Sequence, residues 1–332
     1  MAETGSKKYL ITGITGFAGP HLANLLCNED HQVFGLVRSS NGREDDIRDV
    51  VSDKVFSKIK FLYGDFNDLH AIEKIFETQE FDGVFHLGAQ SHPPTSFIDP
   101  YGTFITNAIG TINIAEVIAK YQPMCNYMMC STSEVYGAPL EEQGDIYEGF
   151  PINPVNPYGV GKAGGDFYVR ERGKTAGLPF YVTRAFSHTG PRRGKKFSIS
   201  SDAYQLIRIK KGLQEPVIKV GTMTSKRVVI DVRDCVNAYY MLMDKFEPGE
   251  AYNVGGDELY PMQHFLDIMI DLSGLKGKIK QEIDPALVRP IDIPVQKPDS
   301  TKLRDLTGWK PKIPLEKTLQ DLLDYWDRKI EG

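Results

Sequence analysis

The sequence predicts an α/β protein: a doubly wound parallel sheet with a smaller, interleaved carboxyl-terminal domain. Three observations predict this class. A glycine-rich turn joins an apolar strand to a helix near the start, strands then alternate with helices along most of the chain, and the end of the chain has helical apolar spacing. Strands that alternate regularly with helices form parallel sheets, because each crossover helix returns the chain to the same edge.

The glycine-rich turn is the strongest local signal. The first strand is expected at residues 9–11, helical spacing begins at Pro20, and Gly13, Gly16 and Gly19 lie between them at intervals of three. In a strand–turn–helix unit such glycines let the backbone turn tightly, approach a pyrophosphate and pack the helix on the sheet. The helix start also favours phosphate charge. The turn therefore predicts a Rossmann-like dinucleotide site, with an ordinary tight turn as the alternative.

The second strand, expected at residues 31–37, bears on the choice of dinucleotide. It is followed by Arg38, with Ser39 and Arg43 nearby and no acid before Glu44. An acid at this strand end holds the ribose hydroxyls of NAD, whereas an arginine accommodates the 2′-phosphate of NADP. We therefore expect NADP, with NAD still possible and a solvated loop arginine as the alternative reading of Arg38.

The remaining elements follow in order. Further core strands are expected at residues 60–66, 83–87, 127–130 and 251–256, and helices at residues 103–119, 231–245, 262–275 and 315–330. Asp65, near the end of the third strand, either meets the adenine or caps the following turn. The strand at 127–130 carries residues 131–137 to its carboxyl end, and ligands of open parallel sheets bind outside such ends.

Composition excludes several classes of protein. The formal net charge of −5 includes no basic block, so we expect no nucleic acid partner. No apolar run approaches the roughly 20 residues of a membrane span, and the polar first four residues do not resemble a signal peptide. The four cysteines, Cys27, Cys125, Cys130 and Cys235, lack metal-binding spacing and are expected to be thiols in a reducing cytoplasm.

A second motif carries candidate chemistry. Asn156 and Pro157 form a helix-start signature, as N-cap and first helical residue. Tyr158 and Lys162, four residues apart, then share one helical face. A lysine charge beside a tyrosine favours the phenolate and lowers its pKa. Tyr158 is therefore a candidate base for a sugar or alcohol hydroxyl, with a surface pair on a helix as the alternative.

Together these motifs resemble the extended short-chain dehydrogenase/reductase family. Within it, the chain is most similar to GDP-mannose 4,6-dehydratases and to their sister GDP-6-deoxy-lyxo-4-hexulose reductases, over nearly its whole length. The dehydratase-like segments are residues 13–16, 87–92, 131–137 and 191–194, and the reductase-like segments are residues 187–191, 216–221 and 308–317.

The resemblance implies catalytic roles for Thr132, Glu134, Tyr158 and Lys162. Thr132 would hydrogen-bond the sugar O4, Tyr158 would act as base, and Lys162 would be its partner and a ribose ligand. Glu134 matches the dehydratase acid/base: once hydride leaves C4, the 4-ketone acidifies the C5 proton, and a carboxylate can take it. Because the reductase branch can also carry a glutamate here, Glu134 is necessary for dehydration without being diagnostic of it.

The resemblance also implies binding residues and no metal. The cofactor positions are Gly13, Thr15, Gly16, Phe17, Gly19, Arg38, Asp65, Phe66, Leu87, Ala89, Tyr158, Lys162 and His188. The substrate positions are Ser91, Ser133, Ser187, Arg193, Lys196, Arg227, Arg289 and Asp292. The chain departs from the family pattern at Ser187, where the family has an asparagine that meets the substrate phosphates. Arg193 and Lys196 could clamp a diphosphate or reach a neighbouring subunit.

The expected function is therefore GDP-sugar 4,6-dehydration, with GDP-mannose as substrate and an internal hydride transfer. An NADPH-dependent reductase or epimerase of a similar GDP-sugar is the alternative. A cofactor-sensing protein without catalysis is a third class, against which Thr132, Tyr158 and Lys162 argue.

The same resemblance implies how the chain divides and associates. Residues 1–186 and 231–256 would form the NADP-binding domain, and residues 187–230 and 257–332 the nucleotide-sugar-binding domain. A homodimer is expected through helices at 103–119 and 158–173, or a tetramer through the Arg192–Arg193 loop.

Overall fold

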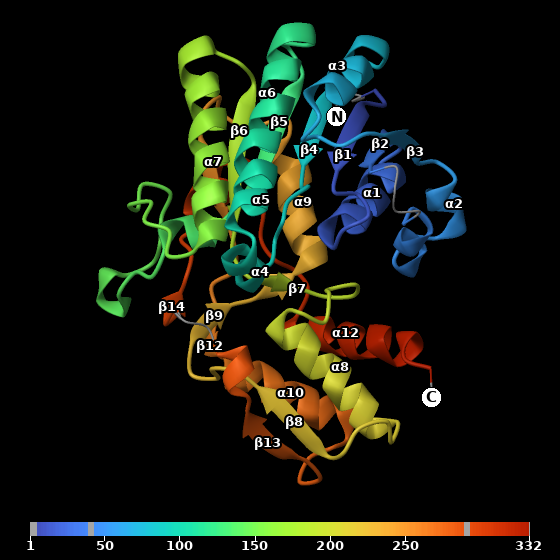
Figure 1. Ribbon diagram of the computed structural model, residues 1–332, viewed down its shortest axis with the longest axis vertical. Helices are drawn as coiled ribbons and strands as arrows, with labels where there is room; N and C mark the ends of the chain where they lie inside the picture. The colour runs from blue at the N-terminus through green and yellow to red at the C-terminus, as the bar shows by residue number, and fades with distance from the viewer. Residues whose placement is uncertain (1–4, 39–42, 289–292, 332) are drawn as a thin grey trace.

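A seven-stranded parallel sheet forms the larger part of the computed structural model, which describes residues 5–38, 43–288 and 293–331 (Figure 1). Its strands are β1 (Lys8–Thr12), β2 (Gln32–Val37), β3 (Lys60–Tyr63), β4 (Gly83–His86), β5 (Asn126–Thr132), β6 (Phe180–Ala185) and β11 (Ala251–Val254). The strand order β11-β6-β5-β4-β1-β2-β3 shows that the chain starts in the middle and winds outward in both directions. The prediction of a doubly wound sheet is confirmed. The winding direction of the strand order reverses between β1 and β4, and open parallel sheets bind ligands at such a point.

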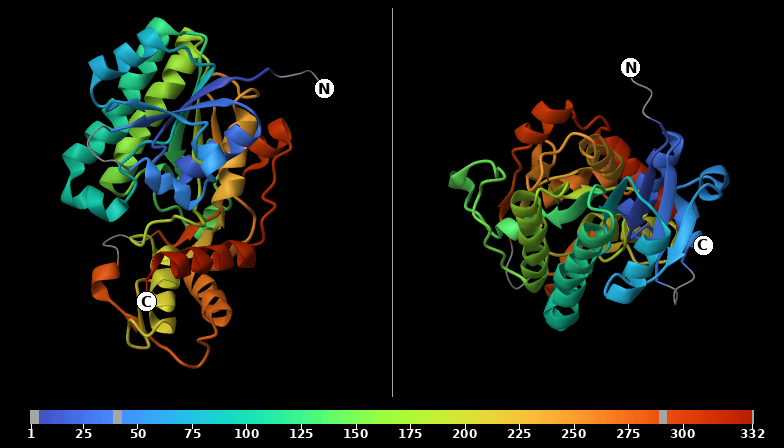
Figure 2. Two further views of the ribbon diagram at one scale, coloured as in Figure 1. Left: turned by 90° about the vertical axis from the view of Figure 1, so that its right-hand side faces the viewer. Right: turned by 90° about the horizontal axis from the view of Figure 1, so that it is seen from above.

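Helices cover both faces of this sheet (Figure 2). On one face lie α1 (Ala18–Asn28), α9 (Val232–Leu242) and the short α2 (Asp53–Phe56), and on the other α3 (Leu69–Thr78), α6 (Gly110–Tyr121) and α7 (Pro157–Ala176). Successive strand residues therefore enter opposite cores: Tyr9 and Ile11 pack in one, and Leu10 in the other. This double burial explains why the strands are continuous apolar runs.

The helix expected at residues 103–119 is longer and irregular. It consists of α5 (Pro100–Phe104), a π-helical segment η2 (Ile105–Ile109) and α6 in direct succession. Glycines on α7 allow it to lie close against this rod: a Cβ on Gly165 would lie 3.0 Å from the Asn107 carbonyl oxygen, and one on Gly161 would lie 3.3 Å from the Asn107 Cβ.

A smaller lobe lies beyond the carboxyl edge of the sheet (Figures 1 and 2). It contains α8 (Ser198–Lys210), α10 (Met262–Ser273), α12 (Leu315–Lys329) and the paired strands β8 (Val217–Val220) and β13 (Lys280–Ile283). These elements share a separate apolar core that includes Leu206, Ile218, Phe265 and Leu322.

Short elements link the two parts. The chain enters the lobe after β7 (His188–Thr189) and leaves through β10 (Ile230–Asp231), which pairs with β7 before α9 begins. The other linking and surface elements are β9 (Lys226–Val228), β12 (Leu259–Pro261), β14 (Val295–Gln296), α4 (Pro93–Ile98), α11 (Thr301–Thr307), η1 (Asp45–Asp49), η3 (Ser133–Tyr136), η4 (Glu141–Gln143) and η5 (Pro285–Leu287). Trp309 follows α11, lies in the core beside α9 and donates its indole N–H to the Asp234 carbonyl at 3.0 Å.

Three differences from the expected bounds matter for the site. Helix α1 begins at Ala18, two residues before Pro20, so Gly19 lies inside its first turn. Strand β3 ends at Tyr63, before Asp65, and β5 runs on to Thr132, which is its last residue.

Of the helices in the described ranges, none is both long and apolar enough to cross a membrane. All four cysteine thiols are free.

A buried ion pair fixes α7 against the sheet. Arg184 on β6 donates through Nε and Nη2 to the two carboxylate oxygens of Asp166 on α7, at 2.9 and 2.8 Å, and both side chains are fully buried. Its Nη1 donates to the Tyr136 hydroxyl and the Glu148 carbonyl, each at 3.0 Å. Burial acts to lower the pKa of Arg184, but the hydrogen bonds and charge of Asp166 outweigh it and raise it.

Removal of one partner should be costly. Arg184→Met would leave the Asp166 carboxylate buried without its cation, so we expect a loss of about 3–5 kcal/mol in the free energy of unfolding, measured by urea titration. Arg170→Met is the matched control, because Arg170 Nη1 lies 3.9 Å from the same carboxylate and is partly exposed.

The control variant should lose no more than about 1 kcal/mol. Adding Asp166→Leu to Arg184→Met should recover much of the loss, since the unpaired charge is then removed. Equal losses for Arg184→Met and Arg170→Met would contradict this account.

Candidate active site

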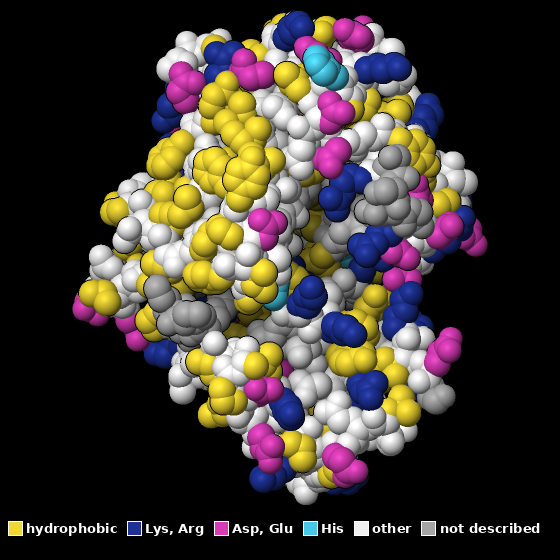
Figure 3. All heavy atoms as spheres, in the orientation of Figure 1, with side chains coloured by type: hydrophobic (Ala, Val, Ile, Leu, Met, Phe, Trp, Pro, Cys, Tyr) yellow, Lys and Arg dark blue, Asp and Glu magenta, His cyan; other side chains and the backbone are white. Residues whose placement is uncertain are grey.

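A cleft of about 990 Å³ lies between the carboxyl edge of the sheet and the smaller lobe. Lysine and arginine side chains gather around its mouth in the space-filling view (Figure 3). Most of the residues predicted for the site line it: Gly13, Gly16, Phe17, Gly19, Leu87, Ala89, Ser91, Thr132, Ser133, Glu134, Tyr158, Lys162, Ser187, His188, Arg193, Lys196 and Arg227. Residues from the first glycine turn to β9 are thus brought to one cavity.

Four predicted cofactor residues do not line this cleft. Arg38 is exposed at the carboxyl end of β2, and Thr15 lies in the glycine-rich turn beside the cleft. Asp65 caps the turn after β3, since its Oδ1 accepts from the Asn67 N–H at 2.9 Å, the second of its two predicted roles. Phe66 packs behind the cleft wall, where a Cβ on Gly88 would lie 2.6 Å from its ring. The predicted Arg289 and Asp292 lie outside the described residues.

The glycine-rich turn leaves room for a phosphate group. Gly13 has φ +71°, and a Cβ there would lie 2.8 Å from the Gly88 nitrogen. The backbone that follows β1 therefore packs directly against the backbone that follows β4. A Cβ on Gly19 would collide with the Gly13 carbonyl. Because the N-cap Phe17 makes no side-chain cap, the first N–H groups of α1 keep their capacity to bind an anion. The turn fits the pyrophosphate of a dinucleotide.

Arg192, in the loop that follows β7, holds this turn directly. Its Nε donates to the Gly16 carbonyl and its Nη2 to the Thr15 carbonyl, each at 2.8 Å, while Nη1 lies 3.1 Å from the Asp49 carboxylate. Asp49 also pairs with Lys329 of α12 at 2.6 Å. The sequence offered Arg192 for a tetramer contact, but its guanidinium is engaged within the chain.

Tyr158, Lys162 and Thr132 meet at the floor of the cleft. Burial raises the pKa of the Tyr158 phenol, and a hydrogen bond with the Thr132 hydroxyl and the charge of Arg193 oppose it. Lys162 donates to the Cys130 carbonyl at 2.7 Å, and burial lowers its pKa. The shared helical face is confirmed. The expected lowering of the Tyr158 pKa by Lys162 is wrong for the protein alone, because burial outweighs the opposing groups.

Glu134 is positioned from two sides. Its backbone N–H donates to the Thr132 hydroxyl at 3.2 Å, and its Oε2 accepts from the Asn156 side-chain amide at 2.8 Å. The other end of that amide caps α7 by accepting from Gly159 N–H at 2.8 Å. Asn156 was predicted only as a helix cap, but it also couples the start of the Tyr158 helix to the Glu134 carboxylate.

Aromatic rings and one arginine form the opposite wall. Phe17 stacks on His188, with ring centroids 5.7 Å apart, and the Arg193 guanidinium lies 4.7 Å from the centre of the Phe17 ring and 3.5 Å from that of Phe197. Burial lowers the pKa of Arg193 to about 10, so it remains a cation at neutral pH. Arg193 therefore presents a fixed positive charge to the cleft, whereas Lys196 is exposed at its mouth.

Comparison with known proteins decides the family. A profile of the GDP-mannose 4,6 dehydratase family matches residues 10–322. The chain belongs to this family. It is 31% identical over 249 residues to a GDP-6-deoxy-D-mannose reductase of Pseudomonas aeruginosa, covering 75% of this chain and 81% of that protein. It is 30% identical over 323 residues to GDP-mannose 4,6 dehydratase 1 of Arabidopsis thaliana, covering 95% and 88%.

The fold agrees with that assignment. The solved structure of RMD from Pseudomonas aeruginosa complexed with NADPH superposes with a TM-score of 0.82 at 26% identity, covering 98% of this chain and all of that one. The resemblance to extended short-chain dehydrogenases/reductases is therefore confirmed. Both branches predicted from the sequence are represented among the relatives.

One residue of the cleft, Asp202, belongs to none of the motifs found in the sequence and was not predicted. Asp202 on α8 lines the cleft and is 4% exposed, and no described residue donates a hydrogen bond to its carboxylate. Burial raises its pKa to about 8. Two neutral groups on the cleft wall, the Ser131 hydroxyl and the Gln296 amide nitrogen, also have no partner in the described part of the chain.

The titration of Asp202 should be visible in stability. The unfolded chain releases this proton near the ordinary pKa of about 4, whereas the folded chain holds it to about pH 8. Between these values the folded state binds the extra proton, so the free energy of unfolding falls as pH rises. Asp202→Asn should therefore raise Tm at pH 8 more than at pH 5, by about 2–4 °C per kcal/mol.

Calorimetry at the two pH values measures the difference, and Asp267→Asn on the exposed side of α10 is the control. A gain in Tm that is the same at both pH values, or that matches the control, would contradict the assignment.

Proposed function

We propose that this protein is a GDP-sugar 4,6-dehydratase that converts GDP-mannose to its 4-keto-6-deoxy product, with NADP as its cofactor. The observation that carries the proposal is the Glu134 carboxylate, which Asn156 holds in the same cleft as Tyr158 and Thr132. Dehydration needs a carboxylate for the C5 proton in addition to the base that serves O4. A reductase or epimerase of the same kind of GDP-sugar is the second candidate, favoured by the similarity to the Pseudomonas reductase.

The residues around the glycine-rich turn support a nicotinamide dinucleotide. The turn at Gly13 and the start of α1 would hold its pyrophosphate, and Lys162 would bond its ribose. Arg38, at the end of β2, would meet the 2′-phosphate that distinguishes NADP from NAD, with Arg43 nearby in the sequence. When bound, this cofactor supplies a site that stores a hydride taken from the sugar and returns it.

Tyr158 and Thr132 serve the first step. The Tyr158 phenolate would accept the proton of the sugar O4 hydroxyl while Thr132 orients that oxygen through its own hydroxyl. Because burial raises the pKa of Tyr158, the phenolate is a strong base once formed. Arg193 and the Thr132 hydrogen bond already favour the ionised form.

Glu134 serves the second step. The 4-ketone makes the C5–H bond acidic, so the Glu134 carboxylate can take that proton and the C5 electron pair forms the C5–C6 double bond as the O6 hydroxyl leaves. The protonated Glu134 gives its proton to the departing hydroxyl, which is released as water. C6 of the double bond would then accept the hydride that the bound cofactor returns, and a proton from solvent would replace the one lost from C5.

The rest of the substrate would extend toward the smaller lobe. Arg193, Lys196 and Arg227 carry the positive charge that a diphosphate requires, and an arginine fork suits such a group. With the sugar at Tyr158 and the diphosphate at these cations, the nucleoside would lie against α8 and β8. We accordingly assign residues 187–230 and 257–332 to nucleotide-sugar binding, and residues 1–186 and 231–256 to NADP binding.

Glu134→Gln separates the two candidate reactions. The amide keeps the shape of the side chain but cannot take the C5 proton, so release of dehydrated product from GDP-mannose should fall by about 10²–10⁴-fold. Reduction of bound NADP, followed by its absorbance, should continue, because Tyr158 is intact. In deuterated water the wild-type product should carry label at C5.

Tyr158→Phe is the matched control for that experiment and should abolish both hydride transfer and water loss while cofactor binding persists. Full dehydration by Glu134→Gln, or a dehydrated product without label at C5, would refute the dehydratase. NADPH-dependent reduction of a 4-keto sugar with little loss in Glu134→Gln would instead establish the reductase.

Cofactor preference tests the role of Arg38. NADP should bind more tightly than NAD. Arg38→Asp should reduce that preference by about 10-fold to 100-fold, because it removes a charge-assisted hydrogen bond to the 2′-phosphate. Isothermal titration with both cofactors measures this. Arg48→Met is the control, because Arg48 lies in η1 and is paired with Asp45 and Asp53. Equal affinity of the wild type for NAD and NADP would refute the role.

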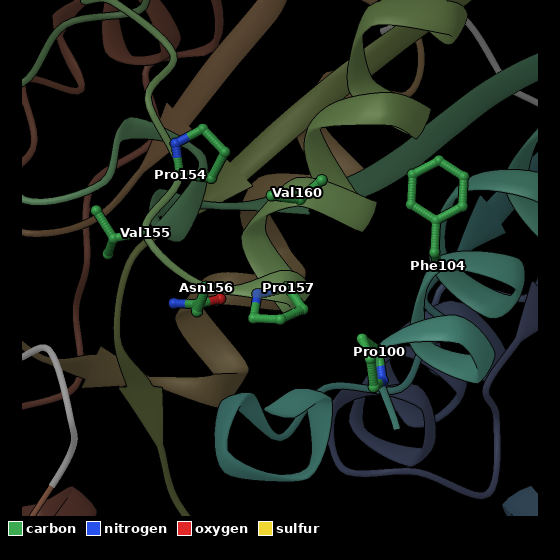
Figure 4. A pocket seen from close by; sticks show the side chains of 7 residues that line it. All are labelled: Pro100, Phe104, Pro154, Val155, Asn156, Pro157 and Val160. Atoms are coloured by element: carbon green, nitrogen blue, oxygen red, sulfur yellow. The ribbon is translucent and has the colours of Figure 1, made fainter. Parts of the chain in front are cut away.

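We also infer a homodimer through α5–α6 and α7. Large apolar side chains are exposed along this face, including Tyr101 (78% exposed), Phe104 (41%) and Phe167 (53%). Hydrophobic side chains gather there in Figure 3, and Figure 4 shows an adjoining apolar hollow of about 470 Å³. Pro100, Phe104, Pro154, Val155, Asn156, Pro157 and Val160 line that hollow. An exposed apolar patch of this kind fits a second copy packed by two-fold symmetry.

Light scattering at micromolar concentration should therefore give the mass of two chains. Phe167→Glu should shift the protein to monomers by burying a charge in the interface, whereas Tyr63→Glu, at an exposed aromatic on β3, should not. A wild-type monomer would disprove the interface.

A further inference from the structure

Asp202 is anomalous within the cleft. It is the acidic residue of α8, it is 4% exposed, and the cleft reaches it although no described residue donates to it. Burial alone raises its pKa, which means that no neighbouring cation offsets its charge. Buried carboxylates without a partner destabilise a protein, and such a cost is usually retained where a ligand supplies the partner.

The surroundings of Asp202 combine hydroxyl groups with apolar side chains, which suits the flat ring and polar edge of a base. Ser198, Ser201 and Asp202 line the cleft from α8, and Val220 and Met223 line it from the end of β8. The side chain of Gln205, one turn further along α8, exchanges two hydrogen bonds of 2.9 Å with the backbone of Lys219, which fixes β8 beside this face.

A second wall completes this end of the cleft. Leu287 and Val288 line the cleft with 48% and 43% of their surface exposed. A Cβ on Gly221 would lie 2.5 Å from the Leu287 carbonyl, so this wall touches the end of β8 directly. A slot in the smaller lobe is therefore lined by the Asp202 carboxylate, by serine hydroxyls of α8 and by apolar side chains from the end of β8 and from Leu287 and Val288.

The charge of Asp202 restricts what can fill the slot. Donors on a bound ligand would favour the ionised form of Asp202, which burial alone disfavours. The ionised carboxylate only accepts hydrogen bonds and repels phosphate, so it requires a neutral ligand edge with donors. The guanine edge offers two adjacent donors, N1–H and the N2 amino group. Uracil and thymine flank their N3–H with carbonyl oxygens, and adenine and cytosine place a ring acceptor beside their amino group. Of the common bases, guanine alone satisfies both oxygens of one carboxylate at once.

We propose that Asp202 is the residue that selects guanine, by accepting hydrogen bonds from N1–H and the N2 amino group of a GDP-sugar. This inference rests on the proposed nucleotide-sugar function and names the residue that sets its base specificity. The base lies between the β8 end and the Leu287–Val288 wall, with the diphosphate at Arg227 and Arg193 and the sugar at Tyr158.

The test compares nucleoside diphosphates that differ at this edge, by isothermal titration with the full chain. Inosine diphosphate lacks only the N2 amino group, so wild type should bind GDP about 10-fold to 100-fold more tightly than inosine diphosphate, and uridine diphosphate more weakly still. Asp202→Asn should bring GDP down to the affinity of inosine diphosphate. This comparison of ligands on the wild type needs no variant to fold.

Two controls identify other causes. Arg227→Met should weaken all three diphosphates by the same factor, because it contacts what they share. Asp267→Asn, at an exposed carboxylate on α10 that does not line the cleft, should keep the preference for GDP.

The remaining outcomes each overturn the assignment. Equal binding of GDP and inosine diphosphate by wild type would show that the N2 amino group is not read. A uniform loss for all three ligands in Asp202→Asn would show that the carboxylate holds the ribose. Binding of none of the three diphosphates, or a preference for uridine diphosphate, would overturn the proposed GDP-sugar substrate as well. A preference for GDP that Asp202→Asn leaves intact would overturn only the assignment to Asp202.

Discussion

The geometry of the cleft depends on the Asp166–Arg184 ion pair. Helix α7 carries Tyr158 and Lys162 near its start, and Asp166 lies one turn beyond Lys162 on the side that faces the sheet. Since Arg184 grips both carboxylate oxygens from β6, α7 can neither rotate nor slide without breaking two charged hydrogen bonds in a dry interior. The same guanidinium holds Tyr136, whose hydroxyl donates to Asn253 on β11 at 2.7 Å. One buried cation thus ties the catalytic helix, the turn after Glu134 and the sheet edge together.

Several ionisable side chains that face the cleft are buried, and their burial lowers the stability of the folded protein. Burial lowers the pKa of Lys162 and raises those of Tyr158 and Asp202, which means that each charged form is destabilised where it is needed. Groups in such surroundings are the ones that a bound substrate or cofactor can ionise or pair. The apolar cores of the two lobes offset these costs, so the groups that face the cleft can be held in surroundings that are unfavourable by themselves.

Local spacing in the sequence carried much of the prediction. The turn at Gly13, the cap at Asn156 and the Tyr158–Lys162 face are each set by neighbours within a few residues, so their patterns could be recognised directly. Arg192 could not, because it bonds Gly16 across 176 positions. The burial of Tyr158 could not be predicted from local spacing either. Its pKa was expected to fall, because the sequence shows the neighbouring lysine but not the residues that bury the phenol. The π-helical segment at Ile105–Ile109 left no signal in the apolar spacing that predicted one regular helix.

Asp202 illustrates why a family resemblance could not complete the site. The resemblance transfers roles to positions where the residue type matches a motif, and Asp202 belongs to no motif that the sequence displayed. What distinguishes it is physical: a carboxylate in an apolar lobe, reached by the cleft and given no donor by the described chain. Glu134 is the opposite case, because it matches the motif but occurs in both branches of the family. Reaction type and substrate base are therefore separate questions. Glu134 and its Asn156 contact bear on the first question, and the slot around Asp202 bears on the second, within one cleft.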